Sequence, residues 1–330
     1  MPTTSTFPCL QRLASLIVLV CLVPVAMRSQ SGAAGRDPQA PAVQNNDDQG
    51  GTIRVNVRLV NVFTTVTDGR GAPVAGLRQQ DFRILEDGVP QTIRLFDKES
   101  EMPLSIVMAI DTSESTRRDL KLEVASAKKF SHSIVRPQDR LAIFQVSENI
   151  DQLTRFTADL RAIDRAIDRL DHGAGTSLYD AIYLAADALI DRQGRKVLVL
   201  ITDGGDTTSK TTYNNALRRA QEAEAIVYSI IVVPVAADAG RNLGGEHALI
   251  QISKDTGGKY YYAESIEQLD QAFSQISEEL RTQYLIAYYP NRRISASPFR
   301  KIQVEIDKKE PEAGQFKVRH RAGYFTAPAK

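Results

Sequence analysis

The chain has 330 residues, of which 42% are hydrophobic and 25% charged. This is ordinary for globular proteins and long enough for about two domains. The formal net charge is +1, and Arg12 and Arg28 are the only charged residues among the first thirty. This balance gives no electrostatic reason to expect nucleic acid or a strongly acidic partner.

The N-terminal segment has the pattern of an export signal. Arg12 precedes an apolar stretch over residues 13–27, which is shorter than the roughly 20 apolar residues of a membrane span. We therefore predict a signal peptide over residues 1–28 and a periplasmic, cell-surface or secreted protein. The alternative is an uncleaved N-terminal anchor, because no clean small-x-small cleavage site follows the stretch.

Both cysteines of the chain, Cys9 and Cys21, lie in this N-terminal segment. If the segment is removed, the remaining protein has neither disulfides nor thiolate metal ligands. A lipoprotein attachment at Cys21 is disfavoured, because Val20 stands where a small residue is expected.

Residues 29–51 are rich in Gly, Ala, Gln, Asn, Asp and Pro and predict a disordered linker. Residues 52–100 then alternate between apolar and polar side chains, with a phase shift near Val60 that indicates a bulge or bend. Short strands are expected at 82–85 and 91–96, with a hairpin turn between them at 86–88.

The C-terminal residues 284–326 are again strand-like. Either β segment alone would bury a small core. We therefore predict that residues 52–100 and 284–326 pair into one small antiparallel β-sandwich, two separate β appendages being the alternative. The strands expected here are 283–289, 301–306 and 316–320.

Between these segments, residues 103–283 alternate between buried-type strands and amphipathic helices. Such alternation predicts an α/β domain with a doubly wound, mostly parallel sheet. The expected strands are 104–111, 141–146, 197–202, 226–233 and 259–262, with a short antiparallel strand at 152–156. The expected helices are 120–134, 163–170, 178–190, 213–223, 247–254 and 266–280.

Oxygen-bearing side chains follow two of the predicted strands. Because parallel strands end at one edge of a sheet, the acids after the strands can approach each other beside several hydroxyls. Oxygen-only donors of this kind suit Mg²⁺, with Mn²⁺ and Ca²⁺ as alternatives. The candidate metal ligands are Asp111, Ser113 and Ser115 after the first strand, Thr176 in a glycine-containing loop, and Asp203 after a later strand.

Each of these pieces also has a purely structural interpretation. Asp, Ser and Thr after a strand are common helix caps, and Thr-Asp-Gly is a common turn. Their joint occurrence at predicted strand ends favours a cation site. Among the neighbouring acids, Asp180 is expected to stabilise a helix N-terminus, and Asp206 and Glu114 to be solvated. The four histidines lack metal-ligand spacing: His132, His172, His247 and His320.

The pattern Asp-x-Ser-x-Ser, a later Thr and a later Thr-Asp-Gly resembles the metal-ion-dependent adhesion site of von Willebrand factor type A domains. The resemblance covers residues 103–283, and the whole chain is similar to the VWFA-related proteins described from Acidobacteria. It implies that Ser113, Ser115 and Thr176 are direct or near-direct ligands of the ion, and that Asp111 and Asp203 act largely through water and by charge. It also implies a non-enzymatic adhesion or protein-binding module whose partner offers an acidic side chain to the metal.

Two other functions stay open at this point. A Mg²⁺-dependent phosphotransferase or phosphatase would also place acids after a first strand, although the second Asp of haloacid-dehalogenase phosphatases is replaced by Ser113. Alternatively, the α/β domain is a scaffold and the β-sandwich is the binding surface. For the binding module, a further prediction is that ligand binding at the metal shifts the last helix, 266–282, and alters the sandwich, because this helix runs directly into the strand at Tyr284.

Overall fold

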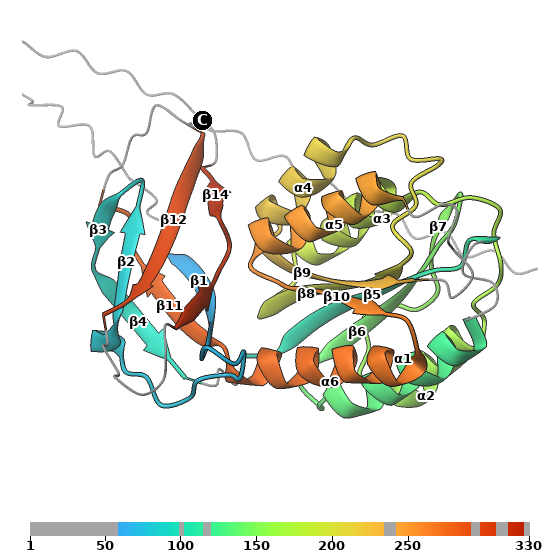
Figure 1. Ribbon diagram of the computed structural model, residues 1–330, viewed down its shortest axis with the longest axis horizontal. Coiled ribbons are helices and arrows are strands. Elements are labelled where there is room, and N and C mark those ends of the chain that lie inside the picture. Colours follow the sequence, from blue (N-terminus) through green and yellow to red (C-terminus); the bar gives the residue numbers. More distant parts are fainter. Residues whose placement is uncertain are drawn as a thin grey trace, which may run out of the picture. The chain divides into compact units, whose positions relative to one another are not determined.

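The computed structural model describes residues 59–98, 102–114, 120–233, 242–291, 298–307 and 316–326. The predicted signal peptide, the linker, the first residues of the β segment up to 58, and Ser115 lie outside the described residues. The described part contains one six-stranded sheet flanked by helices and two four-stranded antiparallel sheets (Figure 1). The predicted fold class is therefore confirmed.

The six-stranded sheet has the order β10-β9-β8-β5-β6-β7. All neighbouring strands are parallel except β7, which runs antiparallel to β6. The chain first moves outward from β5 through β6 and then returns to the other side of β5 with β8, so the strand order reverses between β5 and β8. The strands are β5 (Leu104–Asp111), β6 (Arg140–Val146), β7 (Ile150–Gln152), β8 (Arg195–Thr202), β9 (Ala225–Val232) and β10 (Tyr260–Ala263).

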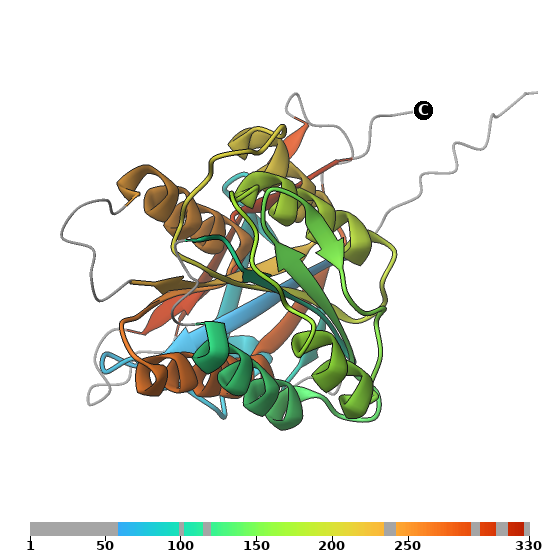
Figure 2. The same cartoon turned by 90° about the vertical axis from the view of Figure 1, so that its right-hand side faces the viewer.

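Helices cover both faces of this sheet. Figures 1 and 2 show α1, α2 and α6 on one face and α3, α4 and α5 on the other. Each set closes its own apolar core, and β5 and β9 are buried along their whole length because both of their faces are covered. The helices are α1 (Leu120–Ile134), α2 (Leu160–Ile167), α3 (Leu178–Ile190), α4 (Tyr213–Glu222), α5 (Leu243–Thr256) and α6 (Ile266–Thr282).

The two antiparallel sheets have the orders β13-β1-β11-β4 and β14-β12-β2-β3. Strand β1 pairs with β11, with Val62 opposite Ile286, so segments from both ends of the chain share one sheet, as predicted. Apolar side chains from both sheets form a separate core. The elements are β1 (Val60–Thr67), η1 (Gln79–Asp81), β2 (Phe82–Glu86), β3 (Val89–Gln91), β4 (Ile93–Asp97), β11 (Tyr284–Tyr288), β12 (Phe299–Ile306), β13 (Lys317–Arg319) and β14 (Gly323–Phe325).

Several elements differ from the expectation. The predicted strand 91–96 corresponds to β4 at Ile93–Asp97, which pairs with β11, but Gln91 belongs to the separate strand β3 beside β2 in the other sheet. The short antiparallel strand is β7 at Ile150–Gln152 rather than 152–156. Strand β14 was not predicted, because it has only three residues and begins with Gly323, where a Cβ would lie 2.1 Å from the Arg300 carbonyl oxygen.

A buried polar cluster surrounds Glu279 near the end of α6. Its carboxylate accepts hydrogen bonds from the hydroxyls of Thr65 (3.2 Å) and Tyr228 (2.7 Å) and forms an ion pair with Arg319 (2.6 Å). Thr65 and Arg319 belong to β1 and β13, so the cluster ties the last helix of the α/β domain to the β-sandwich. Glu279 is only 6% exposed, which makes each of these partners energetically important.

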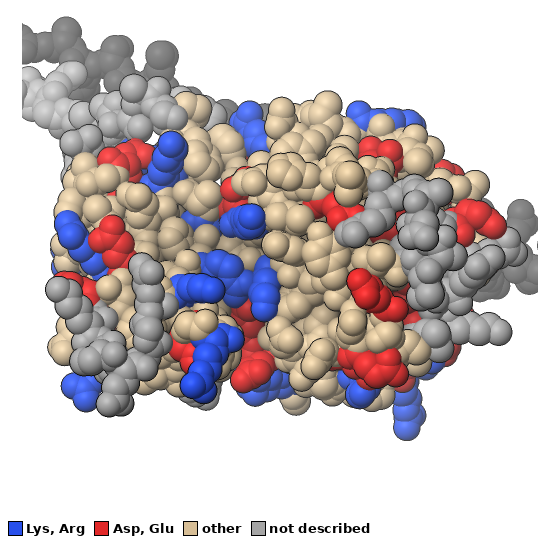
Figure 3. Space-filling view, viewed as in Figure 1, with Lys and Arg blue, Asp and Glu red and all other residues tan. Residues whose placement is uncertain are grey.

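The face of the molecule drawn in Figure 3 carries charged side chains of both signs. On the face drawn in Figure 3, Lys and Arg gather near the middle with acidic side chains beside them. Of the helices in the described ranges, none combines the length and hydropathy needed to cross a bilayer.

Candidate cation site

The carboxyl edge of the sheet brings the predicted site together between β5 and β8. Asp111 is the last residue of β5, and Ile110 lies opposite Ile201 in the parallel register. Asp203 directly follows the end of β8 at Thr202. The two acids therefore lie on neighbouring strands where the strand order reverses, the usual position of sites in open α/β sheets.

Asp111 is buried and accepts hydrogen bonds from the loop after β5 and from the end of β8. Its Oδ1 accepts the Ser113 amide N–H (3.0 Å), and its Oδ2 accepts the Thr202 hydroxyl (2.7 Å). The Ser113 hydroxyl contributes a further hydrogen bond. Burial raises the pKa of Asp111 to about 6 despite these hydrogen bonds, and the negative charge of Asp203 adds to the increase. The charged form of Asp111 is thus costly without a nearby positive charge.

Asp203 and Thr176 face a common position beside Gly205. The Asp203 Oδ1 accepts the Gly205 amide N–H at 2.9 Å. A Cβ at position 205 would lie 3.1 Å from this Oδ1 and 4.0 Å from the Thr176 Oγ1. Gly205 therefore leaves the space next to the Asp203 carboxylate and near the Thr176 hydroxyl free of a side chain.

Four of the five predicted site residues thus gather at this edge of the sheet: Asp111, Ser113, Thr176 and Asp203. Ser113 and Thr176 are buried, each with 3% exposure, so their hydroxyls are held within the protein rather than in bulk solvent. The fifth residue, Ser115, lies outside the described residues. Glu114 is exposed, as expected.

The sequence did not indicate which residues hold the Thr176 loop. The Glu148 Oε2 accepts the amide N–H groups of Ala174 (2.8 Å) and Gly175 (3.2 Å). These bonds, together with one from the backbone of Glu148 itself, lower the pKa of this exposed carboxyl. The loop packs tightly, because a Cβ at Gly173 would lie 2.3 Å from the Ser147 Cβ.

One of the neighbouring acids differs from the expectation. Asp206 is not simply solvated, because its Oδ1 accepts the Leu178 amide N–H at the start of α3 (2.9 Å). Asp180 lies in the first turn of α3, as expected, and its carboxylate also accepts the amide N–H groups of Lys210 (2.9 Å) and Thr211 (2.7 Å).

The donor set is that of a hard cation. Two carboxylates and two hydroxyls meet at one edge, and one of the carboxylates is buried beside the other. A divalent ion would relieve their mutual repulsion and offset the burial of charge. Within the described ranges, no group of three or more His, Cys, Asp or Glu could hold a metal ion, so the hydroxyls are essential donors in any such site. The residues present fit a Mg²⁺-, Mn²⁺- or Ca²⁺-type ion.

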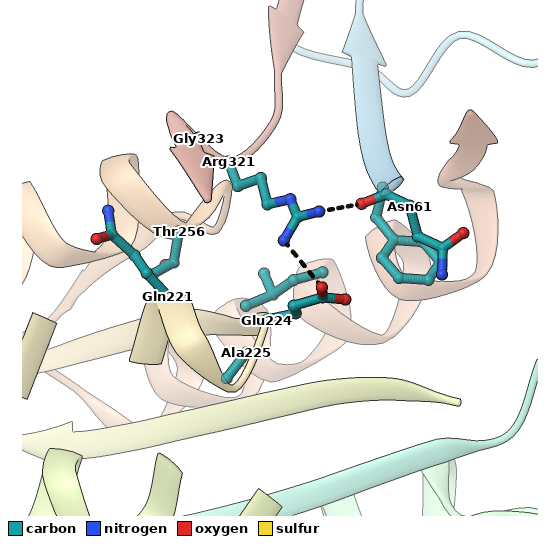
Figure 4. A pocket seen from close by; sticks show the side chains of 9 residues that line it. Asn61, Gln221, Glu224, Ala225, Thr256, Arg321 and Gly323 are labelled. Carbon is teal, nitrogen blue, oxygen red and sulfur yellow. Dashed lines mark hydrogen bonds and ion pairs between the residues drawn. The ribbon is translucent and has the colours of Figure 1, made fainter. Parts of the chain in front are cut away.

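A small pocket lies elsewhere and contains none of these residues. It is lined by side chains that include Asn61, Gln221, Glu224, Thr256 and Arg321. Figure 4 shows the Arg321 guanidinium, which donates to the Asn61 carbonyl oxygen (2.6 Å) and forms an ion pair with Glu224 (3.5 Å). These contacts join the β-sandwich to the α/β domain and do not involve the carboxyl edge of the sheet.

The fold and this edge define a doubly wound α/β domain with an oxygen-donor constellation at its topological switch point. Residues 106–206, which include most of β5 and all of β8, match the family model of the von Willebrand factor type A domain. This part of the α/β domain is therefore identified as a von Willebrand factor type A domain. A comparison with curated protein sequences finds no match.

Several solved structures are similar to part of the chain. The conserved hypothetical protein BatB from Bacteroides thetaiotaomicron is 16% identical over 53% of this chain and 99% of its own, with a TM-score of 0.43. The vWF domain of the type V pili tip protein Mfa5 from Porphyromonas gingivalis is 15% identical over 54% and 94%, with a TM-score of 0.44. The pilus adhesin SpaC from Lactobacillus rhamnosus GG is 10% identical over 75% and 48%, with a TM-score of 0.45.

Proposed function

We propose that this protein is an exported binding or adhesion module that recognises an acidic side chain of a partner protein through a divalent cation. The ion would be held by Asp111, Ser113, Ser115, Thr176 and Asp203. The observation that carries the proposal is the buried Asp111 carboxylate beside Asp203 and two buried hydroxyls at the carboxyl edge of the sheet. The family match at residues 106–206 supports it.

Charge balance explains why such an ion would serve recognition. Two carboxylates carry just enough negative charge to neutralise a divalent cation. The uncharged hydroxyls add further oxygen donors without adding negative charge. An ion coordinated in this way still attracts a further carboxylate in an open coordination position. Asp111 and Asp203 would supply the charge, and Ser113, Ser115 and Thr176 would fix the position of the ion.

The proposed cation is Mg²⁺, with Mn²⁺ and Ca²⁺ as alternatives, because all three prefer oxygen ligands. Isothermal titration calorimetry with each metal chloride tests this step on the purified chain. We expect uptake of about one ion per chain at up to millimolar concentration, and loss of uptake in Asp111→Ala. Asp97→Ala is the matched control, because Asp97 is exposed on β4 of the β-sandwich. Absence of uptake of all three ions by the wild type would refute the metal site.

Partner binding is tested separately with an array of Asp- and Glu-containing peptides and matched Asn and Gln peptides. We expect binding only to the acidic peptides, only with the metal present, and only by chains that retain Asp111. Binding that survives both chelator and Asp111→Ala would instead favour the β-sandwich as the binding surface.

We propose binding rather than catalysis, because the sequence carries neither a phosphate-binding P-loop motif nor a Gly-x-Ser-x-Gly nucleophile motif. Hydrolysis of p-nitrophenyl phosphate by the wild type that is lost in Asp111→Asn would support the phosphatase alternative.

Export is proposed from the apolar segment after Arg12. Fractionation of cells that produce the chain tests it, and a cytoplasmic location would contradict it.

A further inference from the structure

The Thr176 loop is hydrogen-bonded to the loop that carries Asp203. The Thr176 amide N–H donates to the Thr207 hydroxyl (2.9 Å), and the Thr176 carbonyl accepts the amide N–H groups of Thr207 (2.8 Å) and Thr208 (3.1 Å). A Cβ at Gly175 would lie 3.0 Å from Thr208 Cγ2 and 3.1 Å from Thr207 Oγ1, so glycine allows this close approach. The backbone of Thr176 is thus held on both sides by Thr207.

The same loop caps the helix that follows Thr176. The side chain of Ser177, the N-cap residue of α3, makes no capping hydrogen bond. Instead, Asp206 accepts the first amide N–H of α3, and the Ser209 hydroxyl accepts the next two at 3.0 and 3.2 Å. Asp180 reciprocates by accepting two amide N–H groups of residues 210 and 211. The two loops therefore exchange hydrogen bonds in both directions.

These hydrogen bonds connect residues 173–180, around Thr176, with residues 203–211, which begin at Asp203. We call these two segments together the loop clamp. Asp111 and Ser113 lie outside it, because they come from the end of β5 and its following loop. Two of the proposed donors, the Thr176 hydroxyl and the Asp203 carboxylate, are thus carried by backbone segments that hydrogen bonds join to each other.

We propose that the loop clamp, through the Thr207 hydroxyl, determines which cation the site prefers, by limiting how far Thr176 and Asp203 can move relative to each other. This inference rests on the proposed function. Mg²⁺ requires ligands at about 2.0–2.1 Å in near-ideal octahedral geometry, whereas Ca²⁺ accepts about 2.3–2.6 Å in flexible geometry. Donors that are fixed in advance favour Mg²⁺, and donors that can relax favour Ca²⁺. Thr207 is therefore a positioning residue rather than a ligand.

The test is calorimetric titration of the purified chain with MgCl₂ and with CaCl₂. Thr207→Val removes the hydroxyl and keeps the shape of the side chain. We expect Mg²⁺ affinity to fall by about tenfold or more and Ca²⁺ affinity to fall by less than about threefold, since losing a residue that orients ligands typically costs 10–100-fold in affinity. Thr207→Ser retains the hydroxyl and should restore the wild-type Mg²⁺/Ca²⁺ ratio.

Thr208→Val is the matched control, because its hydroxyl bonds to the Ser177 hydroxyl (2.7 Å) rather than to Thr176. It should keep the ratio of the wild type. A Thr207→Val chain with an unchanged ratio would overturn the inference and leave the proposed function standing. A wild type that takes up neither ion would overturn both.

Hydrogen exchange of the chain in EDTA provides a readout that needs no metal. The clamp predicts that amides 176–180 exchange faster in Thr207→Val than in the wild type and in Thr208→Val, because the acceptor for the Thr176 amide is lost. Equal exchange in all three chains would show that Thr207 does not hold this loop, and would overturn the inference independently of ion binding.

Discussion

The buried Asp111 carboxylate should make the metal-free protein less stable than a variant that cannot bind the ion. Its pKa is raised from 3.8 to about 6. At about 1.4 kcal/mol per pKa unit, the charged form costs on the order of 3 kcal/mol at pH 7.5 relative to the unfolded chain. Asp111→Asn removes this charge and keeps an acceptor for the Ser113 amide N–H.

The substitution also has a cost. The Thr202 hydroxyl donates to Asp111 and accepts from the Gly204 amide N–H (3.1 Å). In Asp111→Asn, the side-chain NH₂ group is a donor, so the Thr202 hydroxyl loses its acceptor and meets a second donor beside the Gly204 N–H. A disturbed hydrogen bond costs about 1 kcal/mol. The net expectation is that Asp111→Asn raises the free energy of unfolding of the metal-free protein by about 2 kcal/mol at pH 7.5.

The pH dependence separates this explanation from a general packing effect. Because the pKa is higher in the folded state, the folded protein binds more protons than the unfolded chain between about pH 4 and pH 6. Wild-type stability should therefore fall as pH rises through this window, and Asp111→Asn should lack that part of the decrease. At pH 4 the gain in the variant should vanish.

Urea unfolding in EDTA, followed by far-ultraviolet circular dichroism at pH 4 and pH 7.5, measures both effects. Asp97→Asn serves as an exposed control and should change stability by less than about 0.5 kcal/mol. An Asp111→Asn chain that is no more stable than the wild type at pH 7.5, or equally stabilised at both pH values, would refute the electrostatic reasoning.

Two further predictions concern single positions. Glu279→Ala should lower the free energy of unfolding by about 3–5 kcal/mol, because it leaves buried partners of the carboxylate unpaired. Thermal unfolding against the exposed control Glu278→Ala checks this, and equal melting temperatures would contradict it. Gly205→Ala should weaken Mg²⁺ binding about tenfold, because the new Cβ would lie 3.1 Å from the Asp203 Oδ1 and 4.0 Å from the Thr176 Oγ1, which are proposed donors. Gly244→Ala, whose Cβ would make only ordinary contact at 3.5 Å, should bind as the wild type in the same titration.

The local pattern of the chain was sufficient for the elements of the α/β domain. Helix α3 occupies the predicted residues 178–190, because its apolar side chains recur at helical spacing between a loop and the turn at Gly194. Strand β5 was recognisable as a run of buried residues that ends in Asp111. Since parallel strands end at one edge, the same pattern placed Asp111 and Asp203 near each other.

The corner between β3 and β4 was decided by tertiary structure. A strand that changes sheets shows no break in its alternation, so residues 91–96 looked like one element. The partners of Glu279 on β1, β9 and β13 were equally hidden, because they lie far from it in sequence.

What the sequence determined by itself was therefore the order of strands and helices in the α/β domain and the oxygen-bearing side chains that follow β5 and β8, since both depend on side chains that are close together along the chain. What only the tertiary structure decided was how the Thr176 loop is held. Thr207 lies thirty-one residues after Thr176, and Asp206 lies twenty-eight residues after the amide that it caps. Hydrogen bonds over such separations depend on how the loops fold together, and no periodicity in the sequence records them.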